Sequence, residues 1–428
     1  MPDPSPDSFK IFASTAPGLE SISAGELKTL GIRGRQEIGG VGFGGDLDRL
    51  YEANLWLRTA SRVVVRLGSF HAGTFYELER RAKKLPWPDF LPASGEVRLR
   101  VTCRKSKLYH SDAVAERVLS AITNSTSRVV EGGAAVADDD NADDGNTDAS
   151  ETADAPGHDP KSVGKSAQLF VVRIVHDQCE VSADSSGELL HRRGYRQETA
   201  KAPLRETLAA AMVLASGWKE REPLLDPMCG SGTIPIEAAM IARRIAPGSR
   251  RRFQFMTWPG FEIERWNRIL ERAQAGVTEL FGEILGADRD AGAIQSATRN
   301  AERAGVLASV SFSTDALSGS ITAIDDSVKE SGLILTNPPY GLRVGVSEDL
   351  RNLHAKLGSL LKSKPGWRLG VLTSDSALVR QTRLPLRPRF STLNGGIPVS
   401  FFVSEENSRA EVRMRKSGVG RGAGKDDQ

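Results

Sequence analysis

Cysteine, membrane-length apolar runs and paired histidines are what this chain of 428 residues lacks. Its three cysteines, Cys103, Cys179 and Cys229, lie far apart and form no C-x-x-C pair, which argues against a disulfide scaffold or a structural zinc site. The six histidines show no metal-ligand spacing, so we expect no metal. No apolar run approaches a membrane span, and the first residues have neither the charge nor the apolar core of a signal peptide. We therefore expect a cytoplasmic protein with no membrane partner.

Charge is unevenly distributed, although the net charge is only +3. Residues 131–160 contain ten carboxylates and no lysine or arginine, so 57 basic residues face 44 acidic ones in the rest of the chain, a net charge of +13. Such a surface suits a polyanionic partner, whose binding would weaken steeply with salt. The acidic segment has almost no large apolar residue, so we expect it to be disordered.

A glycine-rich turn follows a short apolar strand in residues 224–233. Gly230 and Gly232 let the backbone approach a ligand closely, and the N–H groups of the helix that we expect next can hold a carboxylate. The third glycine of a dinucleotide fold would fall at Pro235, and the lysine of a P-loop is absent. The turn is therefore suited to the amino-acid end of S-adenosylmethionine.

Acidic residues follow the next two predicted strands. Asp288 ends the first and can accept both ribose hydroxyls of a nucleoside, and Asp315 follows the second, where it can accept from an adenine amino group. A single Asp after a strand is more often a helix cap or turn former, but several such motifs in one register favour binding. The candidate cofactor-binding residues are Asp226, Cys229, Gly230, Gly232, Asp288 and Asp315. For Cys229 we expect a small filler of the turn and not a nucleophile.

The tetrapeptide Asn337-Pro338-Pro339-Tyr340 follows another apolar strand. The prolines remove backbone donors and leave carbonyls and the Asn337 amide oxygen as acceptors, which match the two N–H donors of a planar amine. Tyr340 can stack on the ring that carries the amine. These four residues are the candidate catalytic turn for methyl transfer to a conjugated nitrogen, with an ordinary strand-to-loop turn as the alternative.

With the string Leu190-His191-Arg192-Arg193-Gly194-Tyr195-Arg196 and residues 202–210, these motifs resemble the THUMP-domain RNA methyltransferases over roughly residues 8–403. The resemblance is greatest to bacterial enzymes that methylate guanine N2 in large-subunit ribosomal RNA. It implies S-adenosyl-L-methionine as cofactor and structured RNA as partner, ribosomal in preference to transfer RNA. A transfer RNA guanine-N2 methyltransferase, a DNA adenine-N6 or protein glutamine methyltransferase, and a non-catalytic RNA-binding protein remain as alternatives. We expect a monomer.

The expected fold class is α/β with an α+β module in front. Strands and helices alternate over residues 9–67 in the order of a ferredoxin-like unit, and the resemblance makes the following residues a THUMP half. We expect this RNA-binding module at residues 1–190, with the acidic insert inside it. A seven-stranded, Rossmann-like class I methyltransferase domain is expected at residues 191–405, and a disordered basic tail at 406–428.

Basic residues of the module are the candidates for phosphate contact. Five lie on or beside one predicted strand and three lie at the join to the methyltransferase domain: Arg98, Arg100, Arg104, Lys105, Lys107, Arg192, Arg193 and Arg196. Solvated surface charge is the alternative for each. The acidic insert reads most simply as a solvated loop, and the alternative is that it mimics phosphates and gates the RNA surface. Unchanged RNA affinity after deletion of residues 133–160 would contradict that alternative.

Overall fold

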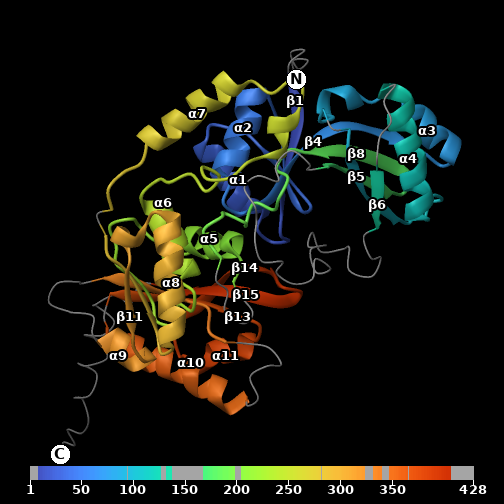
Figure 1. Ribbon diagram of the computed structural model, residues 1–428. Helices are drawn as coiled ribbons and strands as arrows, with labels where there is room; N and C mark the ends of the chain where they lie inside the picture. The colour runs from blue at the N-terminus through green and yellow to red at the C-terminus, as the bar shows by residue number, and fades with distance from the viewer. Residues whose placement is uncertain are drawn as a thin grey trace, which may run out of the picture. The chain divides into compact units, whose positions relative to one another are not determined.

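The computed structural model describes residues 8–93, 95–126, 132–136, 167–197, 204–280, 282–322, 331–339, 347–364 and 366–405 (Figure 1). The chain forms two compact units. Unit 1 comprises Met1–Gly194 with Arg244–Val277, and unit 2 comprises Tyr195–Arg243 with Thr278–Gln428. Within the described ranges, no helix is long and apolar enough to cross a membrane.

Unit 1 contains an eight-stranded sheet in the order β2-β3-β1-β4-β8-β7-β5-β6. The pairs are antiparallel except β5 with β6 and β5 with β7, which are parallel. The strands are β1 (Phe9–Thr15), β2 (Arg35–Glu37), β3 (Gly40–Gly45), β4 (Ala60–His71), β5 (Val97–Arg104), β6 (Gly132–Val136), β7 (Gln168–Val175) and β8 (Gln178–Asp184).

One face of this sheet carries the core of unit 1. Ile11, Val65, Ala183, Phe170 and Leu99 are register partners across five neighbouring strands, and all are buried. Because side chains alternate along a strand, the neighbours of these residues point to the other face. The helices that contribute to the same core are α1 (Glu20–Thr29), α2 (Leu47–Trp56), α3 (Phe75–Ala82), η1 (Trp87–Phe90), α4 (Ser111–Thr126), η3 (Gln254–Thr257) and α7 (Ile263–Ala275).

The segment Arg244–Val277 packs into unit 1, although the sequence placed it in the methyltransferase domain. Its aromatic side chains enter the core: the Phe255 ring stacks on Tyr51 of α2 at 4.5 Å, and Trp258 Nε1 donates to the Gln168 side-chain oxygen at 2.7 Å. Burial of these rings in the core of unit 1 removes a large apolar area from water, which explains why the segment packs there.

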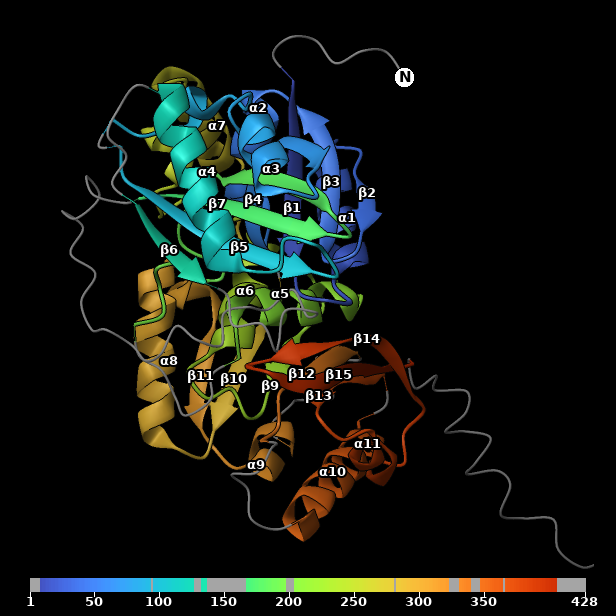
Figure 2. The same ribbon diagram turned by 90° about the vertical axis from the view of Figure 1, so that its right-hand side faces the viewer.

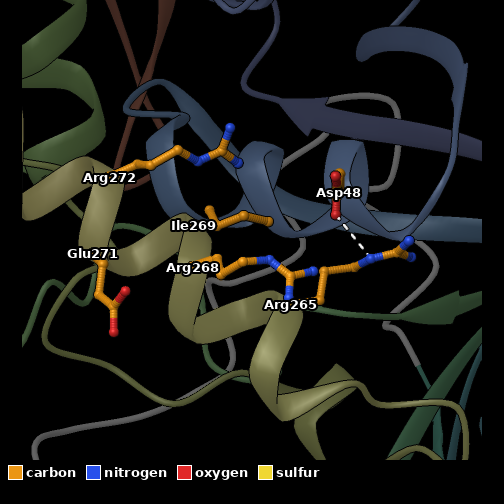
Figure 3. Close-up of a pocket in the computed structure, with 6 residues that line it drawn as sticks. All are labelled: Asp48, Arg265, Arg268, Ile269, Glu271 and Arg272. Carbon is orange, nitrogen blue, oxygen red and sulfur yellow. Dashed lines mark ion pairs between the residues drawn. The ribbon is translucent and has the colours of Figure 1, made fainter.

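Ion pairs also join α7 to α2. Arg265 pairs with Asp48 at 3.1 Å (Figure 3), and Arg272 pairs with Glu52 at 3.7 Å. A cavity of about 370 Å³ beside them is lined by Asp48, Arg265, Arg268, Ile269, Glu271 and Arg272. Two arginines of α7 thus pair with carboxylates of α2, and these ion pairs help to hold the two helices together.

Unit 2 is built on a seven-stranded sheet in the order β11-β10-β9-β12-β13-β15-β14. The first five are parallel and the last two add as an antiparallel pair, which confirms the expected methyltransferase sheet. The strands are β9 (Leu224–Asp226), β10 (Ile284–Asp288), β11 (Ser311–Thr314), β12 (Gly332–Thr336), β13 (Trp367–Thr373), β14 (Leu386–Asn394) and β15 (Ile397–Ser404).

Helices cover both faces of this sheet. Within unit 2, α5 and α6 lie on one side and α10 and α11 on the other in both views (Figures 1 and 2). The helices are α5 (Glu206–Ala215), α6 (Thr233–Ala242), α8 (Ala291–Ala304), η4 (Leu307–Ser309), α9 (Leu317–Thr322), α10 (Ser347–Lys362) and α11 (Ser376–Gln381).

One local expectation is wrong. Residues 132–136 form β6 beside β5, although they fall in the segment expected to be disordered; Gly-Gly-Ala-Ala-Val carries no charge, and the run of aspartates begins only at Asp138. Helix α6 ends at Ala242, and Arg244 just after it adopts a left-handed φ of 55°. The rest of the acidic insert, residues 137–160, and the tail after Glu405 lie outside the described residues.

Candidate functional site

The glycine-rich turn of unit 2 links β9 to α6. Gly230 and Gly232 both have left-handed φ angles, 51° and 82°, which glycine adopts without strain. The Cys229 N–H donates to the Ala287 carbonyl of β10 at 2.9 Å, so the turn lies against the neighbouring strand. A Cβ at Gly230 would meet no atom within 4 Å, which leaves its backbone open to a ligand.

Asp226 ends β9 and is 1% exposed. Its carboxylate accepts from the Met228 N–H at 3.2 Å. Burial raises the pKa of Asp226 to about 7 and neighbouring Asp288 adds to the increase, while the Met228 N–H and the Thr336 hydroxyl lower it. A buried carboxyl of this kind is stabilised in its charged form by a cationic ligand.

Cys229 is buried in the same turn, and its thiol pKa is raised well above the ordinary value by burial and by the carboxylates of Asp226 and Asp288. The thiol therefore remains protonated. This state fits a small side chain that fills the turn and does not fit a nucleophile, because a nucleophilic cysteine reacts as the thiolate.

Asp288 and Asp315 lie at the carboxyl ends of adjacent strands β10 and β11. The Asp288 carboxylate accepts from the Gly230 N–H and from the Asp290 N–H, each at 3.0 Å. The Asp315 N–H donates to the Asp288 carbonyl at 3.0 Å, and its carboxylate accepts from the Ala316 N–H at 2.7 Å. Both carboxylates are partly exposed and keep further acceptor capacity for hydroxyl or amino donors.

Asn337 follows β12, which pairs with β9 in parallel through Ile334 and Leu225. The register therefore places Asn337 and Asp226 at the same edge of the sheet. The Asn337 Oδ1 atom is buried and has no hydrogen-bond partner among the described residues. Pro338 is buried and Pro339 is exposed, while Tyr340 lies outside the described residues.

A second layer of polar contacts supports the turn and escaped the sequence reasoning. Buried Asn300 of α8 donates to the Ser231 carbonyl at 3.1 Å. Arg303 bonds both Asn300 Oδ1 at 2.5 Å and the Tyr195 carbonyl at 2.9 Å, and the Tyr195 hydroxyl donates to Glu237 of α6 at 3.0 Å. The one sequence signal for Asn300 is that it is a polar residue on the apolar face of a predicted helix.

Two arginines expected at the RNA surface are buried. Arg193 is 3% exposed and its guanidinium donates to the carbonyls of Leu190 and Arg58. Arg196 forms an ion pair with Glu206 in which both side chains are buried. Each guanidinium serves the fold, so the prediction of RNA contact is wrong for both.

The other basic candidates lie in unit 1. Arg98, Lys105, Lys107 and Arg192 are exposed, and Arg100 and Arg104 are partly exposed. Their contact with RNA stays a prediction.

Comparison with known proteins places this chain in a family. Residues 193–395 match the family described as "RMKL-like, methyltransferase domain", and residues 10–64 match the "RlmL ferredoxin-like domain". A putative RNA methyltransferase from Synechocystis is 32% identical over 95% of this chain and 100% of its own length. The chain belongs to the THUMP-type RNA methyltransferase family. The expectation drawn from its motifs is thereby confirmed.

Another member of the RNA methyltransferase family, the ribosomal RNA large subunit methyltransferase K/L of Syntrophotalea carbinolica, is 34% identical over 93% of this chain. This chain spans about half (54%) of the length of that relative.

Solved structures of similar proteins share both units of this family member. A putative methyltransferase complexed with SAH has a TM-score of 0.77 and 28% identity, covering 94% of this chain and 99% of its own. A predicted N6-adenine-specific DNA methylase from Listeria monocytogenes also has a TM-score of 0.77, with 32% identity, covering 93% of this chain and 96% of its own. They agree with the α/β methyltransferase fold described above.

Proposed function

We propose that this chain is an S-adenosylmethionine-dependent RNA methyltransferase that acts on an exocyclic base nitrogen, with guanine N2 of large-subunit ribosomal RNA as the favoured target. Relatives named as ribosomal RNA methyltransferases support the RNA class. The observation that carries the chemistry is the buried Asn337 Oδ1, an acceptor that no described residue supplies with a donor, at the sheet edge that holds Asp226. A buried acceptor that makes no hydrogen bond lowers the stability of the folded protein, and the N–H of a substrate amine would supply the donor.

The residues at the strand ends fit S-adenosylmethionine. Asp226 suits the ammonium group of its amino-acid end, the open backbone at Gly230 suits close approach, and Asp288 and Asp315 suit ribose hydroxyls and an adenine amino group. The cofactor, when bound, supplies an electrophilic sulfonium methyl group.

The catalytic turn has to orient a poor nucleophile. We assign to Asn337 Oδ1 and the Pro338 carbonyl the acceptance of the two N–H groups of the base amine, which favours the pyramidal, cationic nitrogen of the transition state. Buried Pro338 has a fixed φ and holds these acceptors in place. The base must leave its stack to reach this edge, so we expect base flipping, and the proton leaves after the methyl group is transferred.

Asn337→Ala tests this assignment. We expect turnover on RNA to fall at least about a hundredfold, the usual result of losing one transition-state hydrogen bond, with nearly unchanged affinity for S-adenosylhomocysteine by calorimetry. Asn267→Ala, an exposed amide on α7, is the matched control and should leave both values unchanged. An equal loss of cofactor affinity in Asn337→Ala would contradict the catalytic role.

The nature of the methylated base needs a separate experiment. The Listeria relative named as a predicted DNA methylase keeps adenine N6 as a second candidate, since the same acceptors suit either amine. Mass spectrometry of ribosomal RNA, transfer RNA and DNA from a deletion strain, and from the strain complemented with Asn337→Ala, would identify the nucleoside that loses its methyl group. We expect N2-methylguanosine to disappear from large-subunit ribosomal RNA in both strains. Loss of N6-methyladenosine from DNA instead would refute the proposal. A cytoplasmic location is part of the same proposal.

A further inference from the structure

Helix α8 packs directly against the glycine-rich turn of unit 2. A Cβ at Gly232 would lie 2.9 Å from the Ala297 Cβ, so the contact leaves no room for a side chain on the turn. Asn300 lies on the same face of the helix, three residues after Ala297, and is fully buried. Its Nδ2 donates to the Ser231 carbonyl at 3.1 Å. The helix therefore holds the turn both by packing and by a hydrogen bond.

That hydrogen bond fixes one end of the peptide group between Ser231 and Gly232. The other end is fixed by the Gly232 N–H, which donates to the Cys229 carbonyl at 2.8 Å. Glycine adopts either sign of φ, so the backbone of Gly232, at a φ of 82°, offers little resistance to rotation of this peptide. Ser231 is buried, so its carbonyl needs a donor from the protein, and Asn300 supplies one.

Arg303 determines which way the Asn300 side-chain amide faces. Such an amide can be turned by half a rotation with little change of shape, which exchanges its donor and its acceptor. A guanidinium has donors only, and Arg303 Nη2 donates to Asn300 Oδ1 at 2.5 Å. Asn300 Nδ2 then faces the Ser231 carbonyl. Arg303 therefore acts on the turn through Asn300.

Arg303 is itself anchored at Tyr195, the first residue of unit 2. Its Nε donates to the Tyr195 carbonyl at 2.9 Å, and the Tyr195 hydroxyl donates to Glu237 Oε1 at 3.0 Å. Tyr195 and Glu237 are both buried. Glu237 belongs to α6, which begins at Thr233 directly after the turn. The hydrogen bonds thus form a ring that leaves the turn at Ser231 and returns to it through α6.

We infer that Asn300 and Arg303 are positioning residues for the cofactor. Asn300 holds the peptide between Ser231 and Gly232 in the orientation that receives the amino-acid end of S-adenosylmethionine, and Arg303 keeps Asn300 facing the turn as a donor. Without this donor the peptide rotates, and only the fraction of molecules with the original orientation binds the cofactor. The inference rests on the proposed function only in that the turn receives this end of the cofactor.

Asn300→Asp separates the donor from the acceptor. Aspartate keeps the shape of the side chain and an acceptor for Arg303, but it offers the Ser231 carbonyl no N–H. We expect affinity for S-adenosylhomocysteine to fall about tenfold by calorimetry, which corresponds to about 1.4 kcal/mol. The melting temperature should stay close to wild type, because the new carboxylate pairs with Arg303. Gln295→Glu makes the same change at an exposed position of α8 and should keep wild-type affinity.

Arg303→Met tests the second residue, and Arg368→Met is its matched control. Arg368 is also partly exposed, and it donates to the Ser216 carbonyl and to a Glu222 side-chain oxygen, each at 2.8 Å. It lies near the start of β13, at the amino edge of the sheet. Both variants should lower the melting temperature. Only Arg303→Met should weaken binding of S-adenosylhomocysteine, by at least about twofold, the loss expected when the amide faces correctly in half of the molecules.

Hydrogen exchange of the Gly232 N–H, followed by NMR of cofactor-free protein with labelled glycine, reports on the peptide itself. The N–H should exchange at least about tenfold faster in Asn300→Asp than in wild type or Gln295→Glu, because a rotated peptide leaves the Cys229 carbonyl. A fall in affinity without faster exchange would overturn the inference, because the peptide would not have moved.

Unchanged affinity in Asn300→Asp, or an equal loss of affinity in Gln295→Glu or Arg368→Met, would also overturn it. Binding of S-adenosylhomocysteine and hydrogen exchange need neither RNA nor methyl transfer. A failure of the proposed activity would therefore appear in the RNA assays and leave these measurements readable.

Discussion

Gly230 and Gly232 form a matched pair that separates the structural from the binding requirements of the cofactor turn. Both have left-handed φ angles, so alanine at either costs about 1–2 kcal/mol. At Gly232 the added Cβ would lie 2.9 Å from the Ala297 Cβ and 3.2 Å from the Phe312 ring, and such overpacking adds about 1–3 kcal/mol. At Gly230 it would meet no atom within 4 Å.

We therefore expect Gly232→Ala to lower the free energy of unfolding by about 2–5 kcal/mol and Gly230→Ala by about 1–2 kcal/mol in urea titrations of the full chain. Affinity for S-adenosylhomocysteine should depend instead on the open space beside the Gly230 backbone. If the open space beside Gly230 receives the cofactor, Gly230→Ala should lose at least about tenfold in affinity by calorimetry although it remains the more stable variant. Wild-type affinity in Gly230→Ala would refute this placement of the cofactor, and equal destabilisation by both variants would refute the packing argument.

Two further predictions concern buried charge. Because burial raises the pKa of Asp226 to about 7, the folded state binds more protons than the unfolded state from about pH 4 to 7, and this carboxyl's contribution to stability declines as pH rises through that range. A cationic ammonium binds the ionised form, so the dissociation constant for S-adenosylhomocysteine should rise up to about tenfold per unit below pH 7 in wild type and stay flat in Asp226→Asn; a flat wild-type profile would contradict this. Arg193→Ala should lower the free energy of unfolding by about 2–4 kcal/mol, since two buried carbonyls lose their donor, whereas exposed Arg192→Ala should change it by less than about 0.5 kcal/mol in the same urea titration.

The candidate site was predictable because its signals are local. A strand, a turn and a polar residue at the strand's end are contiguous in sequence, and parallel strands bring their carboxyl ends to one edge. Asp226, Asp288, Asp315 and Asn337 accordingly meet at the edge of the unit 2 sheet.

What sequence reasoning missed depends on distant partners. Arg193 and Arg196 look like surface charge until their acceptors, Arg58 and Glu206, are known. The position of the Arg244–Val277 segment also depends on distant partners, because its aromatic rings pack into the core of unit 1. The sequence of the segment alone does not show which core its rings enter. Strand β2, Arg35–Glu37, has too few residues for a periodic pattern.

The return of Arg244–Val277 to unit 1 bears on how this protein is made. The chain passes between the units three times, after Gly194, Arg243 and Val277. During synthesis, unit 1 therefore lacks Phe255, Trp258 and Trp266 until the first part of unit 2 has also emerged. The apolar core of unit 1 stays incomplete and exposed to water until then. A chain truncated near residue 190 would lack this part of its core, so unit 1 is not separable by a single cut.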